Sequence, residues 1–238
     1  SLLGTEEALD PEFPIDYLVF SSGAGIYDWQ KKQLVHHHCL NHNQVEYLHG
    51  YLQQISSKSI SLDFIIQLET PHTHRFLFTP ENHNNLDFIS RLKHHQLHGA
   101  PLQNDNLPHA ASEFIVIQAP ETGSLTYEKI KSDLTPDFNV VRATSPIDAK
   151  SVWIEIFHAE ASKGHAADWI REKHRIPKAQ TFALGNDYND LQLLSWAENP
   201  LVVGDAAPEL LEKYQAVAQH SENALAHALE IWLKKLAR

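Results

Sequence analysis

The stretch FALGNDYNDLQLLSWA, residues 182–197, carries the strongest signal for both the fold and the chemistry. An apolar run ends in a glycine, a polar turn follows, and an apolar, helix-like pattern then resumes. The turn contains four side chains with hard oxygen atoms, Asn186, Asp187, Asn189 and Asp190. Carboxylates this close repel one another, and a bound Mg2+ would offset that repulsion. The alternative is a helix cap rich in Asn and Asp that binds no metal.

The segment from residue 152 to the end alternates between strand-like and helix-like patterns. Strands are predicted at 151–159, 181–185, 200–204 and 216–219, and helices at 162–175, 190–198, 207–215 and 222–237. Such alternation predicts βαβ units and a parallel sheet covered on both faces. Ligands of these sheets bind beyond the carboxyl ends of the strands, which is where the acidic turn would lie.

Lys163 stands at the predicted start of a helix, with Ser162 as its N-cap. The helix dipole disfavours a cation at this end, so a lysine here gains when an anion binds to it and to the free backbone N–H groups. The alternative is an ordinary solvated surface lysine.

The rest of the chain has two parts. IDYLVFSSGAGIYD (15–28) predicts a buried strand and a turn of small residues, and its single GAG favours a tight turn into a hairpin over a dinucleotide site. Residues 31–151 hold short strands (63–69, 75–79, 113–119) and helices (43–55, 84–95, 125–134). Their order predicts a small α+β domain with an open, largely antiparallel sheet.

Composition narrows the classes of function. The 238 residues carry a formal net charge of −11, which argues against a nucleic-acid partner. The longest apolar runs are too short to span a bilayer, so we expect no membrane partner. The single cysteine, Cys39, excludes an internal disulfide framework and predicts a cytoplasmic location. Nothing in the sequence predicts an oligomeric state.

Lys163 and GNDYND together resemble the haloacid-dehalogenase (HAD) superfamily phosphatases of the Cof type. In that family a lysine on a helix precedes a Gly-Asp-x-x-Asn-Asp loop, and VVGDAAPELLEKYQAVAQHSENALAHAL (202–229) is similar to the segment that follows. IDYLVFSSGAGIYD is similar to the segment before the cap. The resemblance implies an α/β fold: a HAD-like Rossmannoid core with a parallel sheet (1–30 and 152–238) and an inserted α+β cap of the C2 type (31–151).

The resemblance also implies a site for Mg2+ and a small phosphorylated metabolite such as a sugar phosphate. Lys163 and Asp190 would be catalytic, Lys163 neutralising the phosphate and Asp190 holding the lysine and the metal shell. The implied phosphate contacts are Ser22, Gly23, Lys163 and Asn189, and the implied metal ligands are Asn186, Asp187 and Asp190. Two departures stand out: Asn186 replaces the family's metal-binding aspartate, and Asp205 replaces an asparagine.

A larger departure concerns the nucleophile. The family attacks phosphorus with an aspartate of an Asp-x-Asp motif and forms an aspartyl-phosphate, and the sequence contains no Asp-x-Asp. The chain also contains no methionine and opens on a helix-like segment, residues 1–9. We therefore expect a longer natural enzyme, or a gene product without its catalytic strand. The alternative function is an inactive phosphate-ligand binding or regulatory module.

Histidine-rich segments suggest a different metal. HHHC (36–39), HTH (72–74) and the pair at 94–95 contain ligands suited to zinc or nickel. An extended segment points alternate residues to opposite faces, so HHHC by itself does not bring its four side chains to one ion. We expect surface and hairpin positions for these histidines.

Overall fold

The computed structural model describes residues 14–56, 62–68, 75–80, 85–103 and 107–236. The chain divides into two compact units, Ser1–Ala161 and Ser162–Arg238. The predicted helix at 1–9 and the HTH segment lie outside the described residues.

The first unit begins with a small antiparallel sheet of β1 (Tyr17–Phe20), β2 (Gly25–Asp28) and β3 (Gln33–His37). A 3-10 turn at Ser21–Gly23 joins β1 to β2, and Ser21, Ser22 and Gly23 all have positive φ. Small residues suit such a turn because side chains disfavour that backbone region. The hairpin predicted from the glycine turn is confirmed.

The large sheet of this unit has the order β7-β6-β5-β8-β10-β9, with β4 paired to β8. Its strands are β4 (Leu40–Asn41), β5 (Asp63–Leu68), β6 (Phe76–Phe78), β7 (Gly99–Pro101), β8 (Ala110–Gln118), β9 (Phe138–Thr144) and β10 (Val152–His158). All its pairings are antiparallel except β6 with β7. The predicted antiparallel sheet of the middle segment is therefore confirmed.

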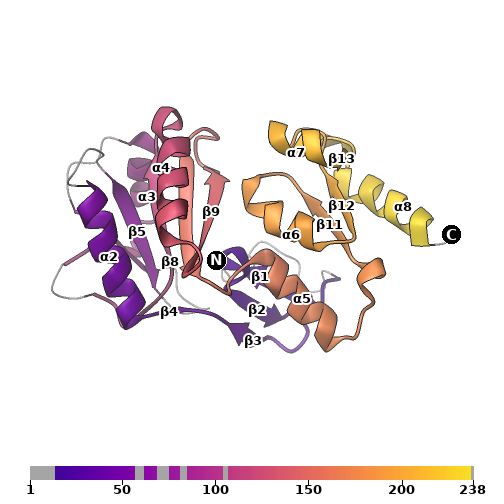
Figure 1. Ribbon diagram of the computed structural model, residues 1–238, viewed down its shortest axis with the longest axis horizontal. Coiled ribbons are helices and arrows are strands. Elements are labelled where there is room, and N and C mark those ends of the chain that lie inside the picture. Colours follow the sequence, from indigo (N-terminus) through magenta and orange to yellow (C-terminus); the bar gives the residue numbers. More distant parts are fainter. Residues whose placement is uncertain (1–13, 57–61, 69–74, 81–84, 104–106, 237–238) are drawn as a thin grey trace. The chain divides into compact units, whose positions relative to one another are not determined.

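Helices cover both faces of this sheet (Figure 1). Leu48 and Leu52 of α2 (His42–Ser56) and Ile130 of α4 (Pro120–Leu134) join the core on one face. Phe88 of α3 (Leu86–His94) packs with Trp153 on the other face. Val45, Leu48, Leu52 and Ile55 form an apolar stripe at helical spacing on α2, which explains its placement because burying that stripe is favourable.

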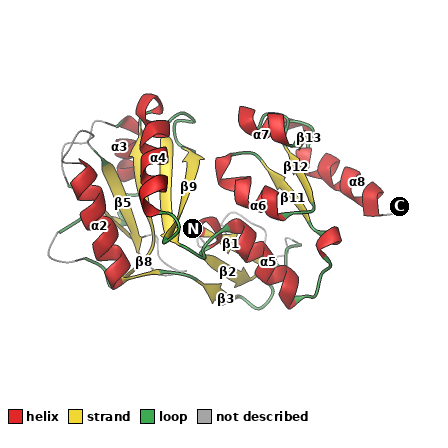
Figure 2. Cartoon of the chain, in the orientation of Figure 1, coloured by secondary structure: helices red, strands yellow, loops and turns green. Residues whose placement is uncertain are grey.

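The second unit contains the parallel sheet β11-β12-β13, formed by Phe182–Gly185, Asn199–Val202 and Gln215–Ala216. Figure 2 shows α6 (Leu191–Trp196), α7 (Pro208–Lys213) and α8 (Ala224–Leu236) beside these strands, and α5 (Lys163–Lys173) next to α6. Its buried core includes Leu194, Leu201, Leu210 and Ala228.

Two strand placements predicted from the sequence are wrong. The strand at 152 was expected to start the parallel sheet, yet β10 pairs antiparallel with β8 and β9. The strand at 15–20 was also expected there, yet β1 pairs antiparallel with β2. β10 is apolar on both faces, as a central strand of either kind of sheet is, so its composition did not reveal its partners. The assignment of the two ends to a core and of 31–151 to a cap stays a prediction.

Candidate functional site

The acidic loop follows β11 at its carboxyl end, as the sequence predicts, and Asp190 is its centre. Asp190 is 7% exposed. Its Oδ2 accepts hydrogen bonds from the backbone N–H groups of Asn186 (2.9 Å) and Asp187 (3.4 Å). The Asp187 side chain in turn caps the 3-10 turn Tyr188–Asp190 by accepting from the N–H of Asp190. The loop is thus a reciprocal capping box, so the predicted alternative of a helix cap rich in Asn and Asp describes its geometry.

Gly185 gives Asp190 the room it needs. A Cβ at Gly185 would lie 2.8 Å from Cβ of Asp190 and 3.1 Å from Cδ1 of Leu194. Two backbone bonds fix the loop on its other side, from Val203 N–H to Gly185 O and from Ala207 N–H to Asn186 O. The strand end is therefore packed too closely for a larger residue, and the Asp190 carboxylate is held in place.

Lys163 meets this carboxylate from the start of α5. The Ser162 side chain accepts from His165 N–H at 3.0 Å, so the predicted N-cap is confirmed. Lys163 Nζ donates to Asp190 Oδ1 at 2.6 Å. The two side chains are 27% and 10% exposed, so this is a partly desolvated, charge-assisted bond. The alternative of a solvated surface lysine is excluded by this contact.

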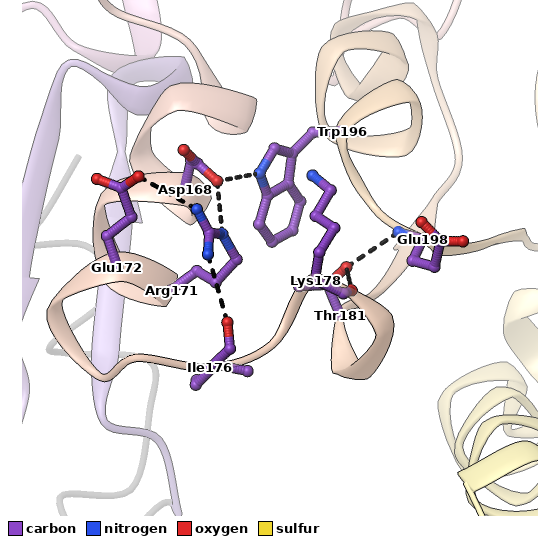
Figure 3. Close-up of polar contacts among 8 residues, drawn as sticks. All are labelled: Asp168, Arg171, Glu172, Ile176, Lys178, Thr181, Trp196 and Glu198. Atoms are coloured by element: carbon purple, nitrogen blue, oxygen red, sulfur yellow. Dashed lines mark hydrogen bonds and ion pairs between the residues drawn. The ribbon is translucent and has the colours of Figure 1, made fainter.

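A second polar network sets the spacing between α5 and α6 (Figure 3). Asp168 Oδ1 accepts from Arg171 Nε (2.7 Å) and from Trp196 Nε1 (2.8 Å). The Lys178 ammonium lies over the Trp196 ring, 4.3 Å from its centroid. The hydrogen bond from Arg171, with a further one from Trp196, lowers the pKa of Asp168, so this carboxylate stays charged at neutral pH.

The helices also touch directly at a glycine. A Cβ at Gly164 would lie 2.9 Å from the backbone oxygen of Gln192. This close approach and the Trp196 network fix the positions of α5 and α6 relative to each other. Lys163 and Asp190 stand at the N-terminal ends of these two helices. Asp168, Arg171 and Trp196 were not predicted from the sequence, where the i, i+3 spacing of Asp168 and Arg171 is the one signal that points to them.

The other residues that the sequence singles out lie in the acidic loop, elsewhere in the second unit, or in the first unit. Asn186 is exposed and Asn189 is half-buried in the same loop. The Asp205 carboxylate contacts His220. Its Oδ1 accepts from the N–H of His220 (3.1 Å) and lies 2.9 Å from His220 Nδ1. The backbone hydrogen bond from His220 is the main cause that lowers the pKa of Asp205.

Ser22 and Gly23 belong to the first unit. Ser22 Oγ donates to Glu155 Oε2 at 2.9 Å, and Gly23 takes a φ of 108°. Ser22 therefore has a structural partner within its own unit, and phosphate binding by these two residues stays a prediction.

Comparison with known proteins identifies the class. The chain matches the haloacid dehalogenase-like hydrolase family over residues 3–229, and it belongs to that family. A haloacid dehalogenase-like hydrolase from B. subtilis has the same fold, with a TM-score of 0.66 at 18% identity over 90% of this chain and 78% of the other. A HAD subclass IIB sugar phosphatase gives a TM-score of 0.65 at 14% identity over 92% and 76%. The predicted fold class, a HAD-like α/β core with an α+β cap, is confirmed.

Curated relatives match over shorter stretches. The Bacillus subtilis (strain 168) protein named "Putative phosphatase YxeH" is 30% identical over 114 residues, which cover 48% of this chain and 40% of YxeH. The matched part thus spans less than half the length of that relative. Among the residues that the structure describes, no helix has the length and apolarity required to cross a membrane.

Proposed function

We propose that this chain carries the charge-neutralising and metal-binding part of a Mg2+-dependent phosphomonoesterase that acts on a small phosphorylated metabolite such as a sugar phosphate. The observation that carries the proposal is the 2.6 Å bond from Lys163 to Asp190 at the carboxyl end of β11. Family membership and the sugar phosphatase among the fold relatives support it. The net charge of −11 supports a small-molecule partner rather than nucleic acid, and the single Cys39 supports a reducing compartment such as the cytoplasm.

Lys163 is suited to bind a phosphate group. An ammonium has three N–H donors, and Asp190 accepts one of them. Asp190 also fixes where the ammonium lies, because its own position is set by the backbone N–H groups of the loop. A lysine held in this way offsets negative charge that develops on the phosphoryl oxygens, with little reorganisation during the reaction.

The oxygen atoms of the loop suit a hard cation such as Mg2+, but the ligands we propose first differ from the set predicted from the sequence. Both oxygens of Asp190 are already engaged, Oδ1 by Lys163 and Oδ2 by backbone N–H groups. The Asp187 carboxylate also accepts a backbone N–H, that of Asp190, but a neutral donor leaves its charge available to a cation. The exposed Asn186 and the Asp187 carboxylate are therefore the first candidates to hold Mg2+, and Asp190 positions Lys163. When bound, Mg2+ would act as a Lewis acid on a phosphate oxygen.

The nucleophile is the missing part of the reaction. The family chemistry forms an aspartyl-phosphate on an Asp-x-Asp carboxylate, and the 238-residue sequence contains none. Lys163, Asn189 and Asp190 can bind and neutralise a phosphate but do not attack phosphorus. This observation favours the second candidate, an inactive phosphate-ligand binding or regulatory module, for the chain as printed.

Activity assays on two proteins separate these functions. One is the 238-residue chain, and the other is a form extended upstream to an Asp-x-Asp strand where the gene encodes one. We expect Mg2+-dependent hydrolysis of sugar phosphates and p-nitrophenyl phosphate from the extended form only. Lys163→Met should lower its kcat/KM by at least a hundredfold, and Lys173→Met, at the other end of the same helix, is the matched control. Mg2+-dependent turnover by the printed chain, lost in Asp190→Ala, would refute the assignment of the nucleophile.

A further inference from the structure

A separate group of metal-ligand side chains lies within the unit Ser1–Ala161. It consists of His38, just after β3, His158, the last residue of β10, and Glu160 in the turn that follows. One ligand atom from each residue lies within 4.8 Å of the other two. The sequence places His38 and His158 120 residues apart, so only the fold brings them together.

The contact between His38 and His36 is compatible with a tautomer of His38 that can bind a metal ion. His38 Nε2 lies 2.8 Å from Nε2 of His36, so one of the two nitrogens carries the proton between them. When His38 is the donor, its Nδ1 holds a lone pair, and this atom lies 3.7 Å from Oε2 of Glu160. That distance is too long for a hydrogen bond but close to the separation of about 3.4 Å between two ligands of a tetrahedral Zn2+. His36 then orients a ligand ring, as outer partners of metal-bound histidines do.

The surroundings keep His38 available as a neutral ligand. Burial is the main cause that lowers the pKa of His38, and the neighbouring His36, His158 and His37 lower it further, against an opposing effect of Glu160. The rings of His38 and His158 are stacked, with centroids 5.3 Å apart and planes 5° apart. Stacked imidazoles do not both direct a lone pair at one point, so one ring turns when an ion binds.

The backbone beneath the cluster is firmly held. His38 N–H donates to Ala24 O at 2.7 Å, and Ala161 N–H donates to His158 O at 2.9 Å. Asn139 Nδ2 donates to Ala161 O at 2.6 Å, which ties the turn that carries Glu160 to β9. Ala24 and Ala161 also share a buried apolar cluster with Phe157. The three ligands therefore start from fixed backbone positions, and the turn of one imidazole ring, with shifts of about 1 Å in the other side chains, completes the site.

We propose that His38, His158 and Glu160 bind a divalent transition-metal ion of the Zn2+ class, with His36 positioning His38. Two imidazoles and one carboxylate are a donor set that leaves one position of a tetrahedral ion open to water or a ligand. Nitrogen ligands distinguish this site from the oxygen-rich acidic loop, which suits Mg2+. The proposal does not rest on the proposed phosphatase function.

Ion binding would replace a long contact between His158 and Glu160. Glu160 N–H donates to Nδ1 of His158 at 3.3 Å, at the long end of the range for an N–H hydrogen bond. Glu160 is exposed and His38 and His158 are partly exposed, so an ion reaches the cluster from solvent. The neighbouring His37 contacts Cys39, with 3.0 Å between Nε2 and Sγ. This pair could also bind a metal ion, so a test must distinguish binding there from binding at His38, His158 and Glu160.

The test is titration of the untagged protein with Zn2+ by calorimetry and with Co2+ by absorption spectroscopy. We expect one equivalent to bind with a micromolar or lower Kd, and a tetrahedral Co2+ spectrum without a thiolate charge-transfer band. His158→Asn and Glu160→Gln should each weaken binding at least tenfold. Because Glu160 is exposed, its variant keeps the fold and so remains informative if His158→Asn misfolds.

The matched control is His220→Asn, since His220 lies 2.9 Å from a carboxylate oxygen but belongs to no group of three metal ligands among the described residues. It should bind Zn2+ as the unaltered protein does. The proposal is overturned if the protein binds no Zn2+, if Glu160→Gln binds it with unchanged affinity, or if a thiolate band is present and is lost in Cys39→Ser.

Discussion

Replacing Asp190 with alanine tests whether this carboxylate organises the site. The change removes the acceptor of Lys163 Nζ (2.6 Å) and of Asn186 N–H (2.9 Å), and that of the longer Asp187 contact (3.4 Å). A hydrogen bond to a charged group contributes about 1.5–3 kcal/mol, and a buried N–H left without an acceptor costs about 1–3 kcal/mol. The Lys163 side chain is 27% exposed, so its ammonium regains water, which reduces the loss from this bond. We expect a loss of about 3 kcal/mol.

Lys163→Met should cost less than Asp190→Ala, about 1 kcal/mol, because the Asp190 carboxylate keeps its backbone donors. Urea unfolding followed by tryptophan fluorescence measures both variants. With a urea dependence of about 1–3 kcal/mol per molar, the Asp190→Ala midpoint should fall by about 1 M or more. Hydrogen exchange at Asn186 N–H should quicken in this variant, which locates the effect at the loop.

Asp205→Ala is the matched control for this comparison. Asp205 lies in the same unit and accepts hydrogen bonds from His220, but its side chain is 46% exposed. We expect a loss below about 1 kcal/mol. The reasoning fails if Asp190→Ala costs no more than Lys163→Met or Asp205→Ala.

Three further perturbations test separate features. Gly164→Ala should destabilise the protein by about 2 kcal/mol, because the new Cβ meets a backbone oxygen of α6. Gly50→Ala, whose new Cβ has nothing within 4 Å, should stabilise α2 by up to about 1 kcal/mol. Urea unfolding midpoints that shift in the same direction for both variants would contradict this. Burial and the charge of Glu155 raise the pKa of Glu113 to about 8. The folded state thus holds a proton that the unfolded state loses above about pH 4.5, so stability should fall as pH rises toward 8, and Glu113→Gln should flatten the melting temperatures measured across that range. Mg2+ alone should bind only at millimolar concentration by calorimetry, and Asn186→Asp should tighten it; micromolar binding by the unaltered chain would mean a different ligand set.

The loop and its lysine were predictable because their signals are local. Ser162 caps the helix it precedes, and the capping box of the acidic loop spans four consecutive residues. Both are short-range interactions that residue type and spacing determine. The sequence did not distinguish the cap role of Asp187 from a metal role, since the same oxygen atoms serve either.

Sheet membership was not predictable in the same way. β10 alternates with helices along the chain, which predicted a parallel strand, but its partners β8 and β9 make it antiparallel. Pairing depends on which distant strands bury its two apolar faces, and strand composition does not encode that choice. The same holds for His38 and His158, whose approach depends on where β3 and β10 end.

The charges of the acidic loop bear on how Mg2+ and phosphate would bind together. Asp190 is neutralised by Lys163, and Asn186 is neutral where the family has an aspartate, so Asp187 brings the remaining full negative charge among the loop's predicted ligands. One carboxylate offsets half the charge of a divalent ion, which predicts weak binding of Mg2+ by itself. A phosphate group would supply the missing negative charge, and Mg2+ would in turn relieve its repulsion from Asp187. Each ligand should therefore strengthen the binding of the other by the same factor, because linkage between two binding sites is reciprocal. Asn186→Asp supplies that charge from the protein, so it should tighten Mg2+ in the absence of phosphate while reducing the coupling between the two.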